Sequence, residues 1–255
     1  MDFTINAYRE LLFVLKNKGY EFITFQEYCK NTVYDKVIIL RHDVDLLPYN
    51  SLRFAQIQAE FGVKGSYYFR AVPESWDEAV IKDIAKLGHE VGYHYENMDT
   101  ARGDVQAAKQ DFEHNLEALR QLVDVQTICM HGSPRSSYDN KDLWKDNSYR
   151  DYGIMGEPYF DMDFDDFFYL TDTGRRWDGW RVSVRDKVSQ QAQWNEKGWV
   201  YHRTFDIINA AQNEILPLRI MFTFHPQRWH ANSLPWLKEL VLQNVKNAVK
   251  YFVVK

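Results

Sequence analysis

The chain has 255 residues, of which 45% are hydrophobic, so it is long enough and apolar enough to bury a sizeable core. Its formal net charge is −5 and it carries no basic block, which argues against a nucleic-acid-binding protein. No run approaches the roughly 20 apolar residues of a membrane span. No secretory signal precedes the two cysteines, Cys29 and Cys129, and we therefore expect a cytoplasmic protein with reduced thiols.

Helical and extended patterns alternate along most of the chain. A β-branched, apolar run at 37–40 predicts a strand buried on both faces. By the same criteria we expect strands at 37–40, 65–69, 90–94, 126–131 and 218–224. Apolar residues at helical spacing predict helices over 8–18, 52–61, 76–87, 105–122, 204–215 and 233–245. This alternation, with short connections, predicts a parallel sheet covered by helices, which is an α/β fold.

The segment 136–214 breaks the alternation. It is rich in Asp, Tyr, Trp and Gly, and turn-like clusters interrupt it. Two short apolar pieces, at 167–170 and 182–184, are candidates for further strands. The sequence contains neither a repeat nor an interdomain linker, so we expect one domain over residues 1–255, with 136–214 as an irregular insertion.

Polar side chains follow most of the predicted strands. Arg41, His42 and Asp43 come directly after the first strand, and Asp45 lies two positions further. The later strands end in Arg70, His94, His131 and His225. A single histidine at a strand end is more often structural. Because the C-terminal ends of parallel strands converge on one face of a barrel, the whole set predicts a shared site.

Carboxylates and histidines gathered in this way are typical of a divalent-metal site. Asp and His ligands suit zinc, with cobalt, nickel or iron(II) as alternatives. Three protein ligands leave a position for water, whose pKa the ion lowers towards about 7, and a second carboxylate can act as general base. Asp43 and Asp45 offer one carboxylate for each role, and His225 is the candidate acid. The structural alternative is that both aspartates cap a loop and pair with Arg41.

Two segments resemble a known family. Residues 40–45 (LRHDVD) and 88–96 (GHEVGYHYE) are similar to the first two motifs of the NodB-type polysaccharide deacetylases, carbohydrate esterase family 4. The resemblance implies an α/β fold, a distorted, TIM-like (β/α)7–8 barrel, here with a long insertion in the second half. It also implies removal of N- or O-acetyl groups from sugars with a divalent metal. By this motif, Asp43 matches the family's base and Asp45 a metal ligand.

The second motif departs from the family at one ligand. His94 matches the first of its two histidines, but the second falls on Met98, a poor ligand for a borderline ion. We therefore expect the third ligand to be His131, which ends the next strand, with Glu96 as the second choice. His89 is the third choice, because it starts its strand and should lie at the opposite end.

The remaining motifs concern the acid and the cation beside the base. The family's third motif places an Arg after the fourth strand, and here that Arg is displaced, so Arg41 or Arg135 is expected to orient Asp43. The end of the last predicted strand, 221–226 (MFTFHP), resembles the final family motif. That resemblance gives His225 the role of acid.

The predicted function is a metal-dependent hydrolase that removes acetyl groups from a carbohydrate, such as a nucleotide- or lipid-linked precursor. The candidate substrate-binding residues are His42, Glu96, Arg175 and Trp177. Two alternatives stay open. One is a carbohydrate-binding barrel that has lost catalysis, with tryptophans of the insertion as stacking platforms. The other is a metal hydrolase of an amide or a phosphodiester, with Arg175 and Arg176 holding an anion. The sequence leaves the sugar, the linkage and the oligomeric state open.

Overall fold

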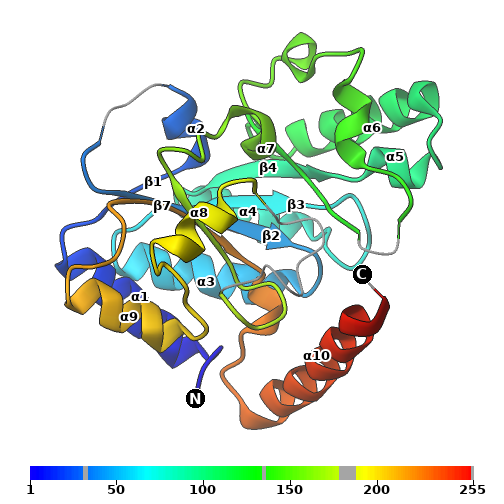
Figure 1. Cartoon of the computed structure of the whole chain (residues 1–255). Coiled ribbons are helices and arrows are strands. Elements are labelled where there is room, and N and C mark those ends of the chain that lie inside the picture. Colours follow the sequence, from blue (N-terminus) through cyan, green and yellow to red (C-terminus); the bar gives the residue numbers. More distant parts are fainter. Residues whose placement is uncertain (31–33, 134–135, 178–187, 254–255) are drawn as a thin grey trace.

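The computed structural model describes residues 1–30, 34–133, 136–177 and 188–253, and Figure 1 shows how its elements are arranged. Two sequence-based candidates, Arg135 and the strand at 182–184, lie outside the described residues. Among the described helices, none combines the length and the apolar character that crossing a membrane would require. The cytoplasmic location stays a prediction.

A single parallel sheet forms the centre of the molecule. Its strands are β1 (Glu21–Ile23), β2 (Val37–Val44), β3 (Ser66–Phe69), β4 (Glu90–Tyr95), β5 (Ile128–Met130), β6 (Phe168–Thr171) and β7 (Arg219–Phe224). They lie in the order β5-β4-β3-β2-β7-β6, and β1 pairs with the start of β2 while β3 pairs with its second half. Every strand pairing is parallel. The predicted α/β class and the five predicted strands are confirmed.

The sheet is strongly curved. In a flat sheet β5 and β2 would be separated by three strand spacings, roughly 14 Å at the usual 4.7–4.9 Å each. Yet His131, which follows β5, places its Nε2 only 3.6 Å from Oδ1 of Asp45, which follows β2. The C-terminal ends of the strands therefore converge, as in a barrel. Within the described residues the ring is open, because β5 and β6 are its two edges, and the barrel is distorted in this sense.

Side chains of β2 alternate between the concave and the helix-covered face of this sheet. Arg41 and Asp43 bond to each other on the concave side. His42, between them, points the opposite way and stacks on Tyr67, with ring centroids 4.1 Å apart. Because successive strand residues face opposite sides, a polar run at the end of β2 is divided between a site and the core.

Helices cover the outer face of the sheet. The longer ones are α1 (Ile5–Asn17), α3 (Pro48–Glu60), α4 (Glu78–Lys86), α6 (Val105–Arg120) and α9 (Thr204–Gln212), and two short ones are α2 (Phe25–Cys29) and α5 (Asn97–Thr100). Helix α10 (Ser233–Val253) lies at the edge of the molecule, and most of its described side chains are exposed. The side chains of Thr4, Asp77 and Asp104 accept hydrogen bonds from the first turns of α1, α4 and α6, which explains where these helices begin. Figure 1 shows α1 and α9 packed side by side.

The segment 136–214 consists mostly of short elements. They are the 3-10 helices η1 (Asn140–Trp144) and η2 (Tyr149–Tyr152), the helices α7 (Pro158–Asp161) and α8 (Gln191–Glu196), strand β6 and helix α9. Strand β6 confirms the candidate strand at 167–170. Gly156 of this segment forms a parallel bridge with Thr127 beside β5. A side chain there would collide with Cys29 Sγ, so this close approach requires glycine.

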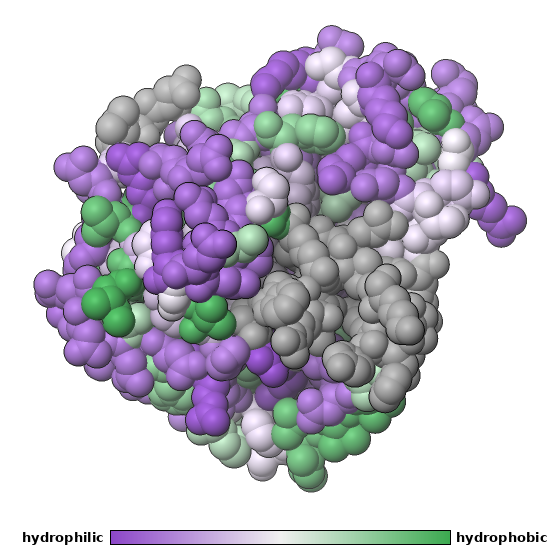
Figure 2. All heavy atoms as spheres, viewed as in Figure 1, coloured by the Kyte–Doolittle hydropathy of each residue, from purple (hydrophilic) through white to green (hydrophobic). Residues whose placement is uncertain are grey.

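Helix α10 packs on the body through its polar and aromatic positions. Trp236 Nε1 donates to the carbonyl of Asp2, and Gln243 is buried. The apolar residues whose spacing predicts this helix include Leu237, Val241 and Val245, and these three are between 52% and 58% exposed. Figure 2 shows a hydrophobic surface at the lower right, where Figure 1 places α10. The periodicity identified the helix but not the side on which it packs.

Candidate metal centre

Three of the predicted metal ligands meet at the C-terminal ends of the strands. The candidate ligand atoms of Asp45, His94 and His131 all lie within 4.8 Å of one another. Asp45 Oδ1 is 3.7 Å from His94 Nε2 and 3.6 Å from His131 Nε2. Asp45 directly follows β2, His94 lies in β4, and His131 directly follows β5. Curvature of the sheet is what brings the ends of these non-adjacent strands together.

The neighbouring strand fixes the orientation of the His94 ring. Its Nδ1 lies 2.9 Å from the carbonyl oxygen of Cys129, which can only accept, so the ring carries its proton on Nδ1. The Nε2 lone pair then faces Asp45. Burial lowers the pKa of His94 well below its usual value and keeps the ring neutral. A neutral imidazole whose other nitrogen donates to a carbonyl is the common arrangement of a metal-binding histidine.

A carboxylate supports His131 from behind. Glu96 Oε2 is 3.0 Å from His131 Nδ1, while both Glu96 oxygens accept from Arg70, at 3.0 and 2.8 Å. Burial opposes ionisation, but the bonds from His131 and Arg70 lower the pKa of Glu96 to about 2. Glu96 is thus committed to His131 and Arg70. These contacts suit a group that orients the His131 ring, and the predicted role of Glu96 in substrate binding stays a prediction.

The donor set fits a divalent ion. Asp45 Oδ1 is buried and accepts no hydrogen bond from any residue in the described part of the chain. The other oxygen, Oδ2, accepts from Gln227 Nε2 at 3.0 Å. A buried carboxylate oxygen without a hydrogen bond is costly unless a cation compensates it. One carboxylate and two imidazoles suit zinc, cobalt, nickel or iron(II).

The second carboxylate, Asp43, is held by a buried cation. Arg41 Nε and Nη2 donate to the two oxygens of Asp43 at 2.8 and 2.7 Å, and both side chains are buried. Asp43 Oδ2 also lies 3.7 Å from His94 Nε2. The Nη2 of Arg41 further donates to the hydroxyl of Tyr159 at 3.3 Å. Of the two arginines expected to orient Asp43, Arg41 contacts it, and Arg135 is outside the described residues.

His225 approaches the same cluster from the end of β7. Its Nε2 is 3.9 Å from Asp45 Oδ2, and its Nδ1 is 2.6 Å from Asp172 Oδ1. Asp172 Oδ2 accepts from the His225 backbone N–H at 3.0 Å and from Trp229 Nε1 at 2.7 Å. Burial and the neighbouring Arg228 act against protonation, yet Asp172 raises the pKa of His225 above its usual value.

Asp172 is a functional candidate that sequence reasoning missed. It directly follows β6, just as Asp45 follows β2, so the rule that polar residues after strands form the site applies to it. The sequence offers this strand only as a candidate, because it lies inside the irregular segment 136–214. The pairing of β6 with β7 then places Asp172 beside His225.

Three predicted substrate-binding residues lie elsewhere. His42 is fully buried on the helix side of the sheet, between Ser66 O and Gln58 Nε2, and the structure contradicts its predicted role. Trp177 is 2% exposed and donates from Nε1 to Thr204 Oγ1, so it is a core residue and not a sugar platform.

Arg175 is also corrected. It lies over the rings of Phe3 and Trp236, at 4.9 and 5.1 Å, and donates to the carbonyl of Arg228. These contacts tie it to the packing of the two chain ends, outside the metal cluster. His89 bonds to Ala55 O and Gly65 N at the other end of β4, as expected.

Comparisons with known proteins give a likeness in fold. No family model and no curated protein matches the chain. A CE4 family pseudoenzyme from Bacillus anthracis is 15% identical with a TM-score of 0.42; the match covers 85% of this chain and 62% of that one. A family 4 carbohydrate esterase from Bacillus anthracis is 12% identical over 93% of this chain and 85% of that one, with a TM-score of 0.42.

A third solved structure gives the same picture. The family 4 carbohydrate esterase PdaA of Bacillus subtilis is 12% identical, with a TM-score of 0.41, over 90% of this chain and 82% of that one. The chain is similar to CE4 proteins. This is the family that the two sequence motifs resemble, and its solved structures include both esterases and a pseudoenzyme, so the likeness assigns no activity.

Proposed function

We propose that this chain is a metal-dependent hydrolase that removes acetyl groups from an N- or O-acetylated carbohydrate. One observation supports the proposal: two carboxylates lie close to the same imidazole ring. Asp43 Oδ2 and Asp45 Oδ1 each lie 3.7 Å from His94 Nε2. One carboxylate is bound by Arg41, whereas the other keeps a buried oxygen without a hydrogen bond. Their different surroundings suit different roles.

Asp45, His94 and His131 would hold the ion. When bound, a divalent ion such as zinc polarises an acyl carbonyl and lowers the pKa of water at its open position. Glu96 and the carbonyl of Cys129 fix the two imidazole rings for this task.

Asp43 is the proposed general base. It accepts the proton of the attacking water, and the bidentate contact with Arg41 holds its carboxylate in one orientation. His225 is the proposed general acid and gives a proton to the leaving nitrogen or oxygen from Nε2. Asp172 holds the opposite ring nitrogen and favours the protonated ring. Asp45 lies between the proposed base and the proposed acid. One of its oxygens is 3.7 Å from Nε2 of His94, which also contacts Asp43, and the other is 3.9 Å from Nε2 of His225.

The arrangement favours a neutral acyl group over a phosphodiester. Recognition of a phosphate anion is favoured by a cation whose charge no carboxylate already balances. Arg41, Arg70 and Arg228 are the described arginines that contact the cluster, and each is paired with a carboxylate. In the proposed site, His131 takes the place of the second histidine of the family motif, where this chain has Met98. A set of three ligands favours an active hydrolase over a barrel that has lost its metal site.

The first experiment measures metal content and acetate release together. The purified chain, before and after addition of zinc or cobalt, is assayed on N-acetylglucosamine oligomers and on O-acetylated sugars. We expect bound metal and acetate release in the unchanged chain. In Asp43→Asn, acetate release should fall at least about 100-fold, the usual contribution of a general base, with metal still bound.

Asp83→Asn is the matched control, because Asp83 is an exposed residue of α4 whose one ion pair within the described part of the chain is with Lys86. It should change neither readout. Failure to bind metal even after zinc or cobalt is added would contradict the proposal and leave the carbohydrate-binding alternative. Metal binding with phosphodiester cleavage but no acetate release would support the other hydrolase.

A further inference from the structure

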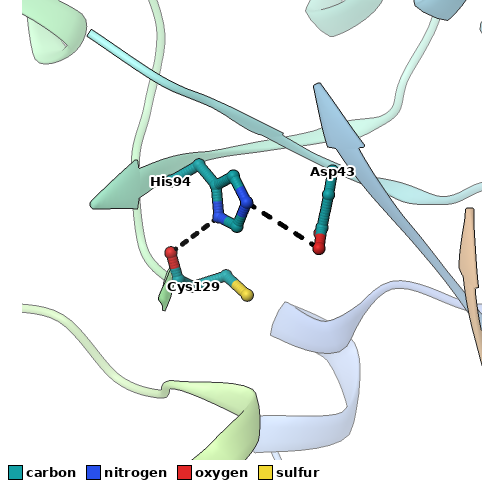
Figure 3. Close-up of side chains that lie close together, drawn as sticks. All are labelled: Asp43, His94 and Cys129. Carbon is teal, nitrogen blue, oxygen red and sulfur yellow. Dashed lines mark hydrogen bonds and ion pairs between the residues drawn. The ribbon is translucent and has the colours of Figure 1, made fainter. Parts of the chain in front are cut away.

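A second cluster of metal-binding groups shares a residue with the first. The candidate ligand atoms of Asp43, His94 and Cys129 lie within 4.8 Å of one another, and all three residues are buried. Figure 3 shows the sulfur of Cys129 beside the ring of His94, on the side of Asp43. The sulfur is neither a ligand of the metal site proposed above nor the proposed base or acid.

Strand pairing fixes the position of Cys129. In the register of β4 and β5, Cys129 is the direct partner of His94. Its carbonyl oxygen binds His94 Nδ1, so Nε2 is the ring nitrogen that remains for a metal ion. The side chain of Cys129 therefore faces the same side as His94 and Asp43, the concave face of the sheet. Strand pairing therefore holds the sulfur at a defined, buried position, and Cys129 is not a surface thiol.

The three groups have the chemistry and spacing of a metal site. Zinc bonds of about 2.0–2.3 Å to oxygen, nitrogen and sulfur in a tetrahedron separate the ligand atoms by about 3.3–3.8 Å. Asp43 Oδ2 and His94 Nε2 are 3.7 Å apart, inside that range. The sulfur has to approach by at most about 1 Å, which a change in one side-chain torsion provides. A thiolate is a soft ligand that zinc, cobalt and cadmium bind well.

We propose that Cys129 is a sulfur ligand, so that the ion of the proposed deacetylase has two overlapping positions around His94. The outer position uses Asp45 and His131, and the inner position uses Asp43 and Cys129. Only one is filled at a time, because both use His94 Nε2. On binding at the inner position, the Sγ–metal bond forms and the thiol proton passes to solvent.

The inner position has a consequence for the reaction. An ion there takes Asp43 as a ligand, and Asp43 is the proposed base. Zinc and cobalt, which accept sulfur as well as oxygen and nitrogen, should divide between the two positions, whereas the more thiophilic cadmium should favour the inner position and slow deacetylation. In this way Cys129 determines which metals activate the enzyme. This inference rests on the proposed function only through the role of Asp43.

The test uses the absorption spectrum of the cobalt-loaded chain. Cobalt(II) is titrated into the unchanged chain, Cys129→Ser and Cys29→Ser, and the near-ultraviolet band of thiolate-to-cobalt charge transfer is recorded. Cys29 is the matched control, since it lies in α2 against Gly156 and belongs to neither cluster. We expect the band in the unchanged chain and in Cys29→Ser, and its loss in Cys129→Ser.

X-ray absorption of the zinc-loaded unchanged chain provides a measurement that needs no variant. One sulfur at about 2.3 Å from zinc supports the inference. A coordination shell of nitrogen and oxygen only, or a cobalt band that survives in Cys129→Ser, overturns it. Both readouts come from the metal, so they are independent of the acetate assay. Sulfur ligation without acetate release would leave this inference standing while contradicting the deacetylase.

Discussion

Asp172 Oδ1 lies 2.6 Å from Nδ1 of His225, and the two residues follow neighbouring parallel strands. The other oxygen of this carboxylate accepts hydrogen bonds from the His225 backbone N–H and from Trp229 Nε1, and these bonds fix the orientation of the carboxylate towards the ring. A buried aspartate that raises the pKa of a histidine keeps that histidine protonated at higher pH. This relationship makes His225 suited to donate a proton.

Replacing Asp172 by Asn should lower deacetylation and change its pH dependence. Without the carboxylate, the pKa of His225 falls, and the limb of the kcat profile on which activity declines at high pH should move to lower pH. We expect kcat to fall by about 100-fold, the lower end of what a general acid contributes, with KM little changed. The measurement is kcat and KM from pH 5 to 10. An unchanged high-pH limb would contradict the role of Asp172.

The strand-end residues were predictable from the sequence because the rule behind them is local. Asp43, Asp45, His94, His131 and His225 were all expected at the C-terminal ends of parallel strands, and the structure brings their side chains to one place. That expectation needs only the ends of strongly apolar strands and the convergence of parallel strands in a barrel. Which of these residues bind metal stays a prediction.

Side-chain direction and long-range packing were harder to predict. The two-residue period of a strand puts His42 on the opposite face from Arg41 and Asp43, and this signal was present in the sequence but not applied. Trp177 could not be placed in the same way. It contacts Phe3 and Trp229, at ring distances of 6.4 and 6.3 Å, so its burial depends on residues far away in the chain.

Removing the supports of the metal centre should give graded losses of affinity. His131→Ala deletes a proposed ligand of the outer position, and we expect it to remove zinc from that position, so that only zinc held by Asp43, His94 and Cys129 remains. Glu96→Gln leaves the ligand but weakens the bond that orients it, which typically costs about 10- to 100-fold in affinity. Competition with a chromophoric chelator measures both. His114→Ala, at an exposed position of α6, is the control and should bind as the unchanged chain does. Equal affinity for all three would contradict the assigned site.

The buried pair of Arg41 and Asp43 should dominate local stability. Replacing Arg41 by Met leaves the Asp43 carboxylate buried without its partner, and such a change typically costs about 3–5 kcal/mol of unfolding free energy. The double variant Arg41→Met/Asp43→Leu removes both charges and should recover most of that loss. Urea unfolding followed by circular dichroism measures both. If the double variant were as unstable as the single one, packing rather than charge would be the cause.

His42 should make the fold sensitive to acid. Burial lowers its pKa from the usual 6.5 to about 3, because the fully enclosed ring loses the solvation of its charged form, and the bond to Ser66 O offsets only part of this effect. The unfolded chain binds a proton at this residue below pH 6.5 and the folded chain does not. The contribution of His42 to stability is therefore complete above pH 6.5 and is lost as the pH falls towards 3.

The variant His42→Gln keeps a donor and an acceptor at this position but cannot be protonated. Between pH 6 and 4 its unfolding free energy should fall less steeply than that of the unchanged chain, by about 1.4 kcal/mol per pH unit. Other groups titrate equally in both chains, so the difference between the two slopes isolates His42. His114→Gln, an exposed histidine treated in the same way, should leave the slope unchanged. Parallel curves for His42→Gln and the unchanged chain would show that the folded protein accepts a proton on His42, against the burial described for it.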